Sequence, residues 1–320
     1  MAVLEDDGSL VMQAFVRRPL DDLPFLADED GPSRFFDIAN PYGYGGPLCI
    51  ATNGREPDDL IDEFEDLFMR DCHARGYASE FSSLHPLLEN HVLLERFHQL
   101  QLTRQKPVVY IPLADGEAGI WRGLNRGQKS SVNRARRAGV EIRRVVPDEA
   151  NLETFKRLYY ETMRRNGAHE RWYFPADYFA NCLAELGEDR VSFFFAEVGG
   201  EVAAAHMLLH GFAIAYYHFG GSDETFSDYR PSSLLIYEAA LWASRQGYRQ
   251  YHLGGGVSSA PDDSLFRFKA GFSEARAMLY TYGRVIDETT YRELSRCKRA
   301  FELRQLGCES DSAYFPLYRR

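Results

Sequence analysis

At 320 residues the chain is longer than a typical single domain, and its length predicts two domains of about 150 residues each. Its 45% hydrophobic and 26% charged residues are ordinary for a soluble globular protein. The formal net charge of −10 argues against a protein that coats nucleic acid with its whole surface, although it leaves room for a local basic patch.

The sequence carries no signal for a membrane or a metal. No apolar run approaches the roughly 20 residues that span a bilayer, and the N-terminus MAVLEDDGSL lacks the basic start and apolar stretch of a signal peptide. We therefore expect a cytoplasmic protein. The five cysteines are widely spaced and form no C-x-x-C pair, so we expect neither disulfides nor a zinc site: Cys49, Cys72, Cys182, Cys297 and Cys308.

The first half of the chain mixes predicted strands and helices. Short runs with strand character lie at 33–38, 48–52, 77–84 and 108–112, the first two on either side of a glycine-rich loop. Apolar residues at helical spacing predict a helix over 58–75 that Gly76 ends. A second helix is predicted over 119–138, with Gly139 as its C-terminal cap.

The second half predicts a regular alternation of strands and helices. A strand at 140–146 leads to a helix that opens at Pro147 and Asp148, and a further helix is predicted at 175–186. Three strands follow at 190–198, 201–210 and 213–220, the first two joined by a Gly199-Gly200 turn. Pro231 begins a long helix that ends at Gly247, and the chain returns to a strand at 249–253.

The segment Tyr251–Ser273, YHLGGGVSSAPDDSLFRFKAGFS, combines three glycines with one lysine among aromatic residues. Glycine allows close approach of the backbone because no Cβ intervenes. Lys269 follows Phe268 directly and lies three residues from Phe266 and Phe272, so its ammonium is expected near apolar surface, where a cation can stabilise developing negative charge. From the residues alone, a surface lysine with its head in water is an equally open interpretation.

Basic residues are concentrated between Trp121 and Arg144, where Glu141 is the one acid in the sequence WRGLNRGQKSSVNRARRAGVEIRR. In an acidic protein this segment is a focused positive patch, suited to the phosphates of a ligand or of RNA. An ordinary solvated helix face is the alternative. Arg126 and Arg134 are our candidates for donor or phosphate binding in this segment.

Four motifs occur in the order found in Fem-type aminoacyltransferases, which belong to the GNAT acyltransferase superfamily: YGYGGP, the basic helix, LGGG and FRFKAGF. The chain resembles that family along nearly its whole length. The resemblance implies an α+β fold of two tandem GNAT-like domains, each a mixed, mostly antiparallel sheet flanked by helices. Residues 1–146 would form the first, acceptor-side domain, with 297–320 packing back on it, and 147–296 the second, donor and catalytic domain.

The same resemblance implies roles for particular residues. Lys269, in its F-K-x-G-F context, would stabilise the oxyanion or the leaving oxygen. The substrate-binding candidates are Tyr42 and Tyr44 of the first-domain loop, Arg171 and Tyr173, Tyr216 and His218 of one strand, and Phe268. The helix start at Tyr229, Arg230 and Ser232 corresponds to the turn that holds the coenzyme A pyrophosphate in GNAT enzymes, but YRPSS is poorer in glycine and basic residues than that turn usually is.

We therefore expect direct transfer of an aminoacyl group, from aminoacyl-tRNA, to an amine of a peptide, nucleotide-linked or sugar acceptor. No cofactor is expected beyond the donor co-substrate. The chain contains no G-x-S-x-G, Rossmann or Walker motif, so a nucleophilic enzyme, a dehydrogenase and an ATPase are disfavoured. Two alternatives stay open: an acyl-CoA-dependent N-acyltransferase acting on an amino sugar or small amine, and a non-catalytic RNA- or anion-binding protein on the same fold.

Overall fold

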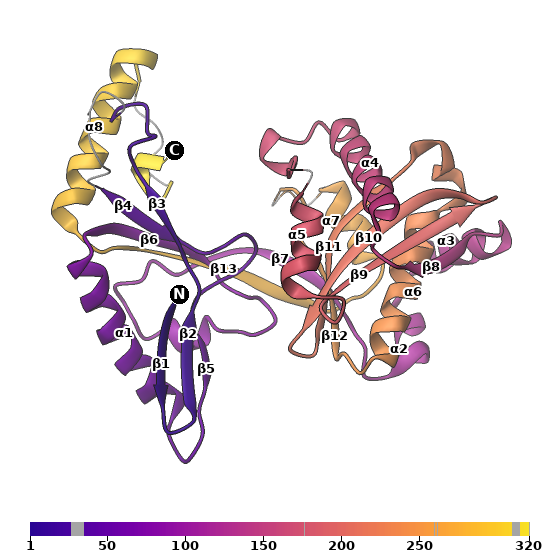
Figure 1. Ribbon diagram of the computed structural model, residues 1–320, viewed down its shortest axis with the longest axis horizontal. Helices are drawn as coiled ribbons and strands as arrows, with labels where there is room; N and C mark the ends of the chain where they lie inside the picture. The colour runs from indigo at the N-terminus through magenta and orange to yellow at the C-terminus, as the bar shows by residue number, and fades with distance from the viewer. Residues whose placement is uncertain (27–34, 176, 259, 261, 309–313, 320) are drawn as a thin grey trace. The chain divides into compact units, whose positions relative to one another are not determined.

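The computed structural model describes residues 1–26, 35–175, 177–258, 260, 262–308 and 314–319. Part of the strand predicted at 33–38 lies outside these residues. The chain divides into two compact units, residues 1–106 with 278–320 and residues 107–277 (Figure 1). It passes from one unit to the other twice, within strand β7 (Thr103–Pro112) and within strand β13 (Arg276–Val285).

These units differ from the predicted division at residue 146. Strand β8 (Glu141–Val145) pairs with β9 (Val191–Val198), and helices α2 (Gly116–Gly123) and α3 (Arg126–Arg137) pack on α6 (Pro231–Arg245), so residues 107–146 belong to the second unit. The predicted end of the second domain at residue 296 is also too late. Residues from Met278 onward, including the C-terminal segment 297–320, belong to the first unit.

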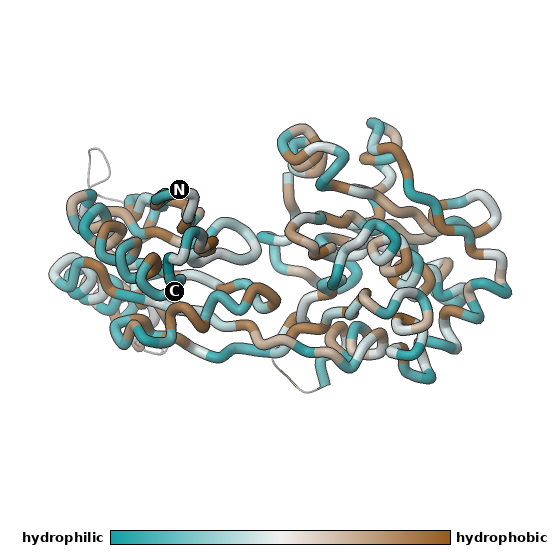
Figure 2. The backbone as a smooth tube through the Cα atoms, turned by 90° about the horizontal axis from the view of Figure 1, so that it is seen from below, coloured by the Kyte–Doolittle hydropathy of each residue, from teal (hydrophilic) through white to brown (hydrophobic). Residues whose placement is uncertain are grey.

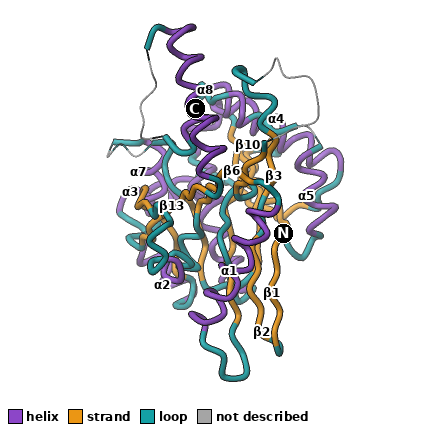
Figure 3. Tube along the Cα trace, turned by 90° about the vertical axis from the view of Figure 1, so that its left-hand side faces the viewer, coloured by secondary structure: helices purple, strands orange, loops and turns teal. Residues whose placement is uncertain are grey.

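The first unit contains two sheets and two long helices. Strands β1 (Ala2–Asp6), β2 (Ser9–Gln13) and β5 (Leu48–Ile50) form an antiparallel sheet against which helix α1 (Pro57–Ala74) packs (Figure 3). The second sheet has the order β3 (Val16–Pro19), β4 (Phe36–Ala39), β6 (Tyr77–Ser83) and β13. The 3-10 turn η1 (Val92–Leu94), helix α8 (Glu288–Leu306) and the 3-10 turn η4 (Leu317–Arg319) complete it. The strands before residue 20 were not predicted.

Helix α1 forms as its sequence predicts. Pro57 occupies its first turn, where the missing N–H costs nothing, and Gly76 follows its end with φ of 67°. Leu60, Ile61, Phe64 and Phe68 recur at helical spacing and are buried. They form the core of this unit together with Ile38 and Tyr77 of the neighbouring strands.

A buried ion network lies between α1 and the second sheet. Arg284 is 1% exposed and pairs with Glu80 (2.6 Å) and with Glu65. Tyr282 donates its hydroxyl hydrogen to Glu80 (2.7 Å). Burial raises the pKa of Glu65, and the positive charge of Arg284 opposes that shift. Because the guanidinium is neutralised by carboxylates on two different elements, this network ties β6, β13 and α1 together.

The second unit is built around one mixed sheet, in the order β7, β12 (Gln250–Gly254), β11 (Ile214–Ser222), β10 (Glu201–Gly211), β9 and β8. Neighbouring strands are antiparallel except β11 and β12, which are parallel. Helices α2, α3 and α6 share a core with one face of the sheet, and α4 (Glu149–Arg165) and α5 (Tyr178–Leu186) with the other (Figure 1). The predicted mixed, mostly antiparallel sheet flanked by helices is thus confirmed.

The helix predicted over 119–138 is two helices. Leu124 is extended, with ψ of 137°, and α3 starts afresh after Asn125. The Asn125 side chain accepts a hydrogen bond from the Gln128 backbone N–H (2.8 Å), which caps α3. The Asn125 N–H itself donates to the Gly271 carbonyl (2.9 Å), a partner 146 positions further along the chain that periodicity does not reveal.

A β-bulge shapes the strand that carries the predicted Tyr216 and His218. Met207 pairs with Phe219 and Leu208 with Tyr217, so His218 is the extra residue of β11. On the core side of the same strand, Phe219 packs with Tyr159 and Phe179 of helices α4 and α5. Gly221 allows α4 to lie directly on β11, because a Cβ there would come within 2.4 Å of the Leu158 backbone.

No helix in the described residues combines the length and the apolar character needed to cross a membrane. In Figure 2 the hydrophobic stretches are short and alternate with hydrophilic ones along the tube. This is the pattern of amphipathic elements that bury one face.

Gly221→Ala should destabilise the second unit. A Cβ would meet backbone atoms of Leu158 and Tyr159 at 2.4–2.5 Å, and backbone cannot move aside as a side-chain tip can. We expect a loss of about 2 kcal/mol in the free energy of unfolding, measured by urea denaturation followed by circular dichroism. Gly123→Ala is the control, because its Cβ would meet nothing closer than 3.7 Å. Equal stability of the two variants would contradict this packing.

Candidate active site

The sheet of the second unit opens where β11 and β12 part. Their parallel pairing covers three residue pairs and ends at Tyr216 and His252, although β11 continues to Ser222. On the other side, β12 ends at Gly254, whose φ of 81° turns the chain away from the strand. Beyond Tyr216, β11 is therefore no longer paired with β12, although it stays paired with β10 as far as Ser222.

Lys269 reaches this opening from helix α7 (Ser264–Ala270). The residue is 9% exposed, and its Nζ donates a hydrogen bond to the Gly255 carbonyl oxygen (2.9 Å). The Nζ also lies 5.5 Å from the centroid of the Tyr217 ring, within range of a cation–π interaction. The ammonium is thus buried and oriented, and the open interpretation of a solvated surface lysine is wrong.

Side chains from three adjacent strands cluster near this ammonium. The ring of His206 on β10 packs edge-on against Tyr217 of β11, with centroids 4.5 Å apart, and Tyr251 of β12 lies in the same core. Within the described residues, His206 Nδ1 and the Tyr251 hydroxyl have no hydrogen-bond partner. Burial, followed by the charge of Lys269, lowers the pKa of His206 to about 3. Burial also raises the pKa of Tyr217 and Tyr251, so both phenols are neutral near pH 7.

Glycine makes room for this cluster at two places. A Cβ on Gly220 would come within 2.1 Å of the Tyr217 hydroxyl and 2.8 Å of His206 Cδ2. A Cβ on Gly256 would come within 2.4 Å of the Asp263 carboxylate, which caps α7 through the Phe266 N–H (2.8 Å). Within the glycine triplet, Gly256 therefore lets Asp263 lie close to the backbone, which supports the start of the helix that carries Lys269.

A cavity of about 240 Å³ lies at the N-terminus of α6. Its lining comes from α4, the end of β11, the 3-10 turn η3 (Glu224–Tyr229), α6 and α7: Arg165, Ser222, Asp223, Glu224, Ser227, Arg230, Pro231, Ser232, Ser233 and Phe268. Two of the predicted donor-binding residues, Arg230 and Ser232, and the predicted substrate-binding Phe268 thus line one space. Phe268 directly precedes Lys269, so helix α7 contributes one residue to the cavity and the next to the lysine cluster.

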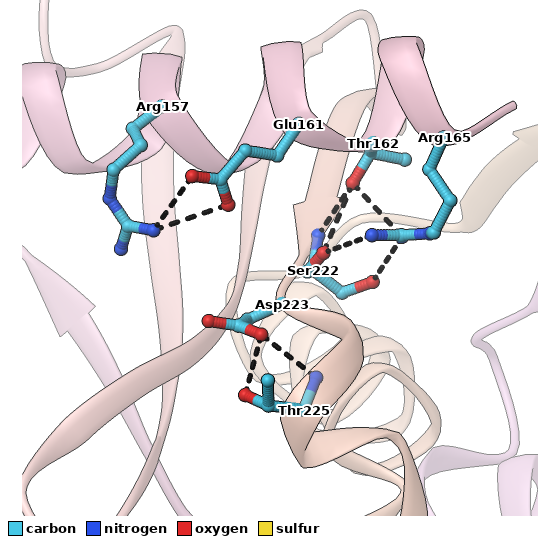
Figure 4. A network of polar contacts seen from close by, with 7 residues as sticks. All are labelled: Arg157, Glu161, Thr162, Arg165, Ser222, Asp223 and Thr225. Carbon is cyan, nitrogen blue, oxygen red and sulfur yellow. Dashed lines mark hydrogen bonds and ion pairs between the residues drawn. The ribbon is translucent and has the colours of Figure 1, made fainter. Parts of the chain in front are cut away.

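Polar contacts fix the wall of the cavity that α4 provides (Figure 4). Arg165 donates to the Ser222 carbonyl (3.0 Å) and hydroxyl (3.2 Å), and the Ser222 N–H donates to Thr162 (2.9 Å). Asp223 accepts from the Thr225 hydroxyl (2.6 Å) and N–H (2.9 Å), which lowers its pKa. The cavity therefore presents fixed positive and negative groups together.

The start of α6 offers few donors to a phosphate. Pro231 has no N–H, and the Ser233 N–H donates to the Arg230 carbonyl (3.2 Å). Of the first three helical positions, the Ser232 N–H is the donor left for a ligand. Arg230 caps the helix in the left-handed region, with φ of 58°. An anion site with several convergent N–H groups, the usual cradle for a diphosphate, is not formed by these residues.

The basic segment is partly neutralised by acids from elsewhere in the sequence. Arg122 pairs with Asp115 (2.7 Å), Arg134 with Asp228 (3.4 Å), Arg136 with Glu238 (2.9 Å) and Arg143 with Glu197. In the described part of the chain, Arg126 and Arg137 on α3 have no such partner, and both are exposed. The positive surface is narrower than the sequence indicates.

The other predicted residues of the second unit lie on the α4 and α5 side of the sheet. Tyr216 contacts His252 of β12, with ring centroids 5.6 Å apart. His218 Nε2 hydrogen-bonds the Tyr178 hydroxyl (3.1 Å), and burial lowers the pKa of His218 to about 4. In the 3-10 turn η2 (Glu170–Trp172), exposed Arg171 stacks over Trp172 (5.4 Å), while Tyr173 packs near Tyr160 (6.0 Å).

Tyr42 and Tyr44 belong to the first unit, in the loop between β4 and β5. Asn40 orders this loop by donating to the Pro41 carbonyl (2.7 Å) and accepting from the Ser83 N–H (2.9 Å). The Tyr44 ring packs edge-on against His85, with centroids 5.0 Å apart, whereas Tyr42 is 54% exposed. Exposure of an aromatic ring on an ordered loop is consistent with contact to a ligand.

Sequence reasoning did not single out His206, Tyr217, Tyr251 or Arg165 as site residues. A histidine on an apolar strand is usually a core residue. Tyr217 points away from Tyr216 and His218, which were the candidates of this strand. Tyr217 and Lys269 belong to one site because they face the same core. This becomes visible only when one knows where the pairing of β11 and β12 ends. No group of three or more His, Cys, Asp or Glu residues in the described ranges could hold a metal ion.

Comparison with known proteins shows which family part of this chain resembles. Residues 126–269 match the family model described as an acetyltransferase (GNAT) domain. The UDP-N-acetylmuramoylpentapeptide-lysine N(6)-alanyltransferase of Weissella viridescens is 29% identical over 168 residues, which cover 52% of this chain and 48% of that protein. The match thus spans about half the length of that relative.

Solved structures share the fold. The crystal structure of FemX superimposes with a TM-score of 0.68 at 13% identity, covering 91% of this chain and 89% of FemX. L-PGS from Bacillus licheniformis gives 0.55 at 15% identity, covering 87% of this chain and 82% of L-PGS. The C-terminal domain of a putative lysylphosphatidylglycerol synthetase from Agrobacterium fabrum gives 0.54 at 15%, covering 94% and 88%.

The part of the second unit that matches the GNAT domain model, residues 126–269, contains Lys269 and the residues that line the cavity at the start of α6. The similarities to a Fem-type alanyltransferase and to the FemX fold agree with the resemblance that the motifs indicate.

His206 should make the stability of the second unit depend on pH. Its pKa is about 3 in the folded protein and about 6.5 when unfolded, so the unfolded state binds a proton first as the pH falls. Stability is complete above pH 6.5 and is lost below it, at about 1.4 kcal/mol per pH unit for this group. His206→Gln should reduce the loss between pH 6.5 and 5 by about 2 kcal/mol in urea denaturation. The exposed His98→Gln should keep the wild-type loss, and equal slopes for all three proteins would contradict the burial of His206.

Proposed function

We propose that this protein is an acyltransferase that forms an amide by transferring an aminoacyl group to an amine of a peptide, nucleotide-linked or sugar acceptor. The observation that carries the proposal is the Lys269 ammonium, buried and aimed by the Gly255 carbonyl where β11 and β12 part. A fixed positive charge in a site sheltered from water is what a reaction with a developing oxyanion requires. The similarity to a Fem-type alanyltransferase supports the same class of reaction.

The reaction needs two substrates and one stabilising charge. The lone pair of the acceptor amine attacks the ester carbonyl carbon of the donor, forming a C–N bond and a tetrahedral oxyanion. The bond to the ester oxygen then breaks, the amine nitrogen loses a proton and the departing oxygen gains one, so an amide and a hydroxyl result. Lys269 would donate a hydrogen bond to the oxyanion or to the departing oxygen, and Tyr217 and His206 beside it would be neutral.

We propose aminoacyl-tRNA as the donor, with no further cofactor. The start of α6 supports this choice, because Pro231 and the internally bonded Ser233 leave little to hold the diphosphate of coenzyme A. Exposed Arg126 and Arg137 on the neighbouring α3 suit the phosphates of an RNA backbone. Charged tRNA is a cytoplasmic substrate, so the proposal places the reaction in the cytoplasm. An acyl-CoA donor is the competing possibility within the same superfamily.

For the acceptor, the proposal assigns two groups of residues. In the second unit, Arg171, Tyr173, Tyr216 and His218 are the candidates for contact with the acceptor. In the first unit, taken by itself, Tyr42 and Tyr44 are the candidates for binding a substrate. Guanidinium and phenol groups suit carboxylates, phosphates and peptide carbonyls. A lysine-containing, nucleotide-linked pentapeptide, the acceptor type in the name of the Weissella relative, is the acceptor with which to begin.

Lys269→Met should abolish most of the transfer without unfolding the protein. Removing a charge that acts on the transition state costs about 100-fold or more in kcat, with KM within about twofold. The assay follows radiolabelled alanine from alanyl-tRNA into the lysine-containing nucleotide-linked pentapeptide. Lys156→Met, which removes a lysine paired with Glu153 on the surface of α4, is the matched control.

Two outcomes of that assay would count against the proposal. Wild-type activity that Lys269→Met leaves intact would refute the role of the lysine but keep the class of enzyme. No transfer with charged tRNA or acyl-CoA pools, together with retained RNA binding, would favour the non-catalytic binding protein.

Charge reversal on α3 should separate the two donors. Arg126→Glu and Arg137→Glu should each weaken tRNA binding on the order of tenfold and lower its salt dependence by about one ion per lost phosphate contact. The measurement is fluorescence anisotropy of labelled tRNA at several salt concentrations. Arg245→Glu, an exposed arginine at the end of α6, is the control. Thermal stabilisation by coenzyme A, with no response to tRNA, would overturn the tRNA donor in favour of acyl-CoA.

A further inference from the structure

Helix α8 of the first unit borders a cavity that the proposed reaction does not use. The cavity has a volume of about 630 Å³, within the range of small-molecule sites. α8 supplies most of its lining, and Leu317 of η4 supplies the rest; α8 is the yellow helix in Figure 1 and is seen again in Figure 3. Three arginines line it, Arg292, Arg296 and Arg299.

The arginines lie on one face of the helix. Their spacing of four and three residues places them one above another, where like charges repel and destabilise a helix. Arg292 is compensated by Glu288 (3.1 Å). Arg296 and Arg299 are exposed and form no ion pair or hydrogen bond with any residue that the structure describes. Within the described part of the chain, their charges are therefore uncompensated.

Several basic residues on other helices pair with acids one turn away, as Arg75 does with Asp71 and Arg157 with Glu161. On α8 itself, Lys298 pairs with Glu302 (2.9 Å). Arg296 and Arg299 have no such partner among the described residues, and they line a cavity.

The cavity also has an apolar part. Leu303 lines it and is 49% exposed, and Tyr291 and Leu317 contribute an aromatic ring and an aliphatic chain. Ser295 lines it as well, and its hydroxyl has no hydrogen-bond partner in the described chain although the residue is 8% exposed. Positive charge, a free hydroxyl and apolar surface thus adjoin one another.

We propose that this cavity binds a small phosphate ester whose other part is apolar or aromatic. Guanidinium groups bind phosphate through paired hydrogen bonds. A phosphate group therefore suits the two arginines, Arg296 and Arg299, better than a single carboxylate does. Tyr291, Leu303 and Leu317 would take the apolar part. The proposal does not depend on the reaction assigned to the second unit.

The test is a calorimetric titration of the full chain with phenyl phosphate and with inorganic phosphate. We expect saturable binding of phenyl phosphate, tighter than that of inorganic phosphate. The double variant Arg296→Gln/Arg299→Gln should weaken it by about tenfold or more, since a charge-assisted hydrogen bond contributes at least that factor. Leu303→Ser should remove the preference for the aromatic ester. Arg304→Gln, an exposed arginine of the same helix outside the cavity, should bind as the wild type does.

Three results would overturn the proposal. One is no saturable binding of either phosphate by the folded wild-type chain, and another is equal weakening by Arg304→Gln. The third is binding to phosphatidylglycerol vesicles, but not to phosphatidylcholine vesicles or to phenyl phosphate, which would make the arginines a membrane-facing patch. Lys269→Met should bind phenyl phosphate normally, so failure here is distinguishable from failure of the transferase proposal.

Discussion

The site of the second unit depends on burying one ammonium group where a sheet stops pairing. A buried cation needs compensation, and Lys269 receives part of it from the Gly255 carbonyl and the face of Tyr217. The remaining features follow from this choice. His206 must stay neutral, Gly220 must lack a Cβ so that Tyr217 and His206 fit, and Gly256 must lack one so that Asp263 can hold the start of α7.

The first unit solves a similar problem in the opposite way. Arg284 is only 1% exposed, but two carboxylates, Glu65 and Glu80, share its charge. Such a group is neutralised and has little left to offer a ligand, so it serves to join elements. Lys269 donates a hydrogen bond to a neutral backbone carbonyl, and our proposal assigns its charge to a substrate oxyanion. In that proposal the nature of the partner, and not the depth of burial, separates a structural cation from a chemical one.

Local patterns predicted the elements that local forces determine. Helix α1, the Gly199-Gly200 hairpin and the Pro231 start of α6 all depend on residues within a turn or two of one another. What escaped prediction depends on distant partners. The break at Leu124 is fixed by Gly271, the bulge at His218 by packing against α4 and α5, and the unit boundary by pairing of β8 with β9. Lys269 became a candidate site residue through its F-K-x-G-F context, whereas its neighbours His206 and Tyr251 can be recognised only once the fold is known.

Charge shows the same limit in both directions. The run of arginines between Trp121 and Arg144 is the strongest basic feature of the sequence, yet Asp228, Glu238 and Glu197 neutralise much of it from far along the chain. The arginines of α8 are interspersed with acids in the sequence and predict nothing, yet Arg296 and Arg299 remain uncompensated among the described residues. A run of like charges in a sequence consists of residues that are neighbours along the chain, whereas a ligand contacts residues that are neighbours in space. To find an anion site in an acidic protein, one therefore asks which cationic side chains the folded chain leaves unpaired.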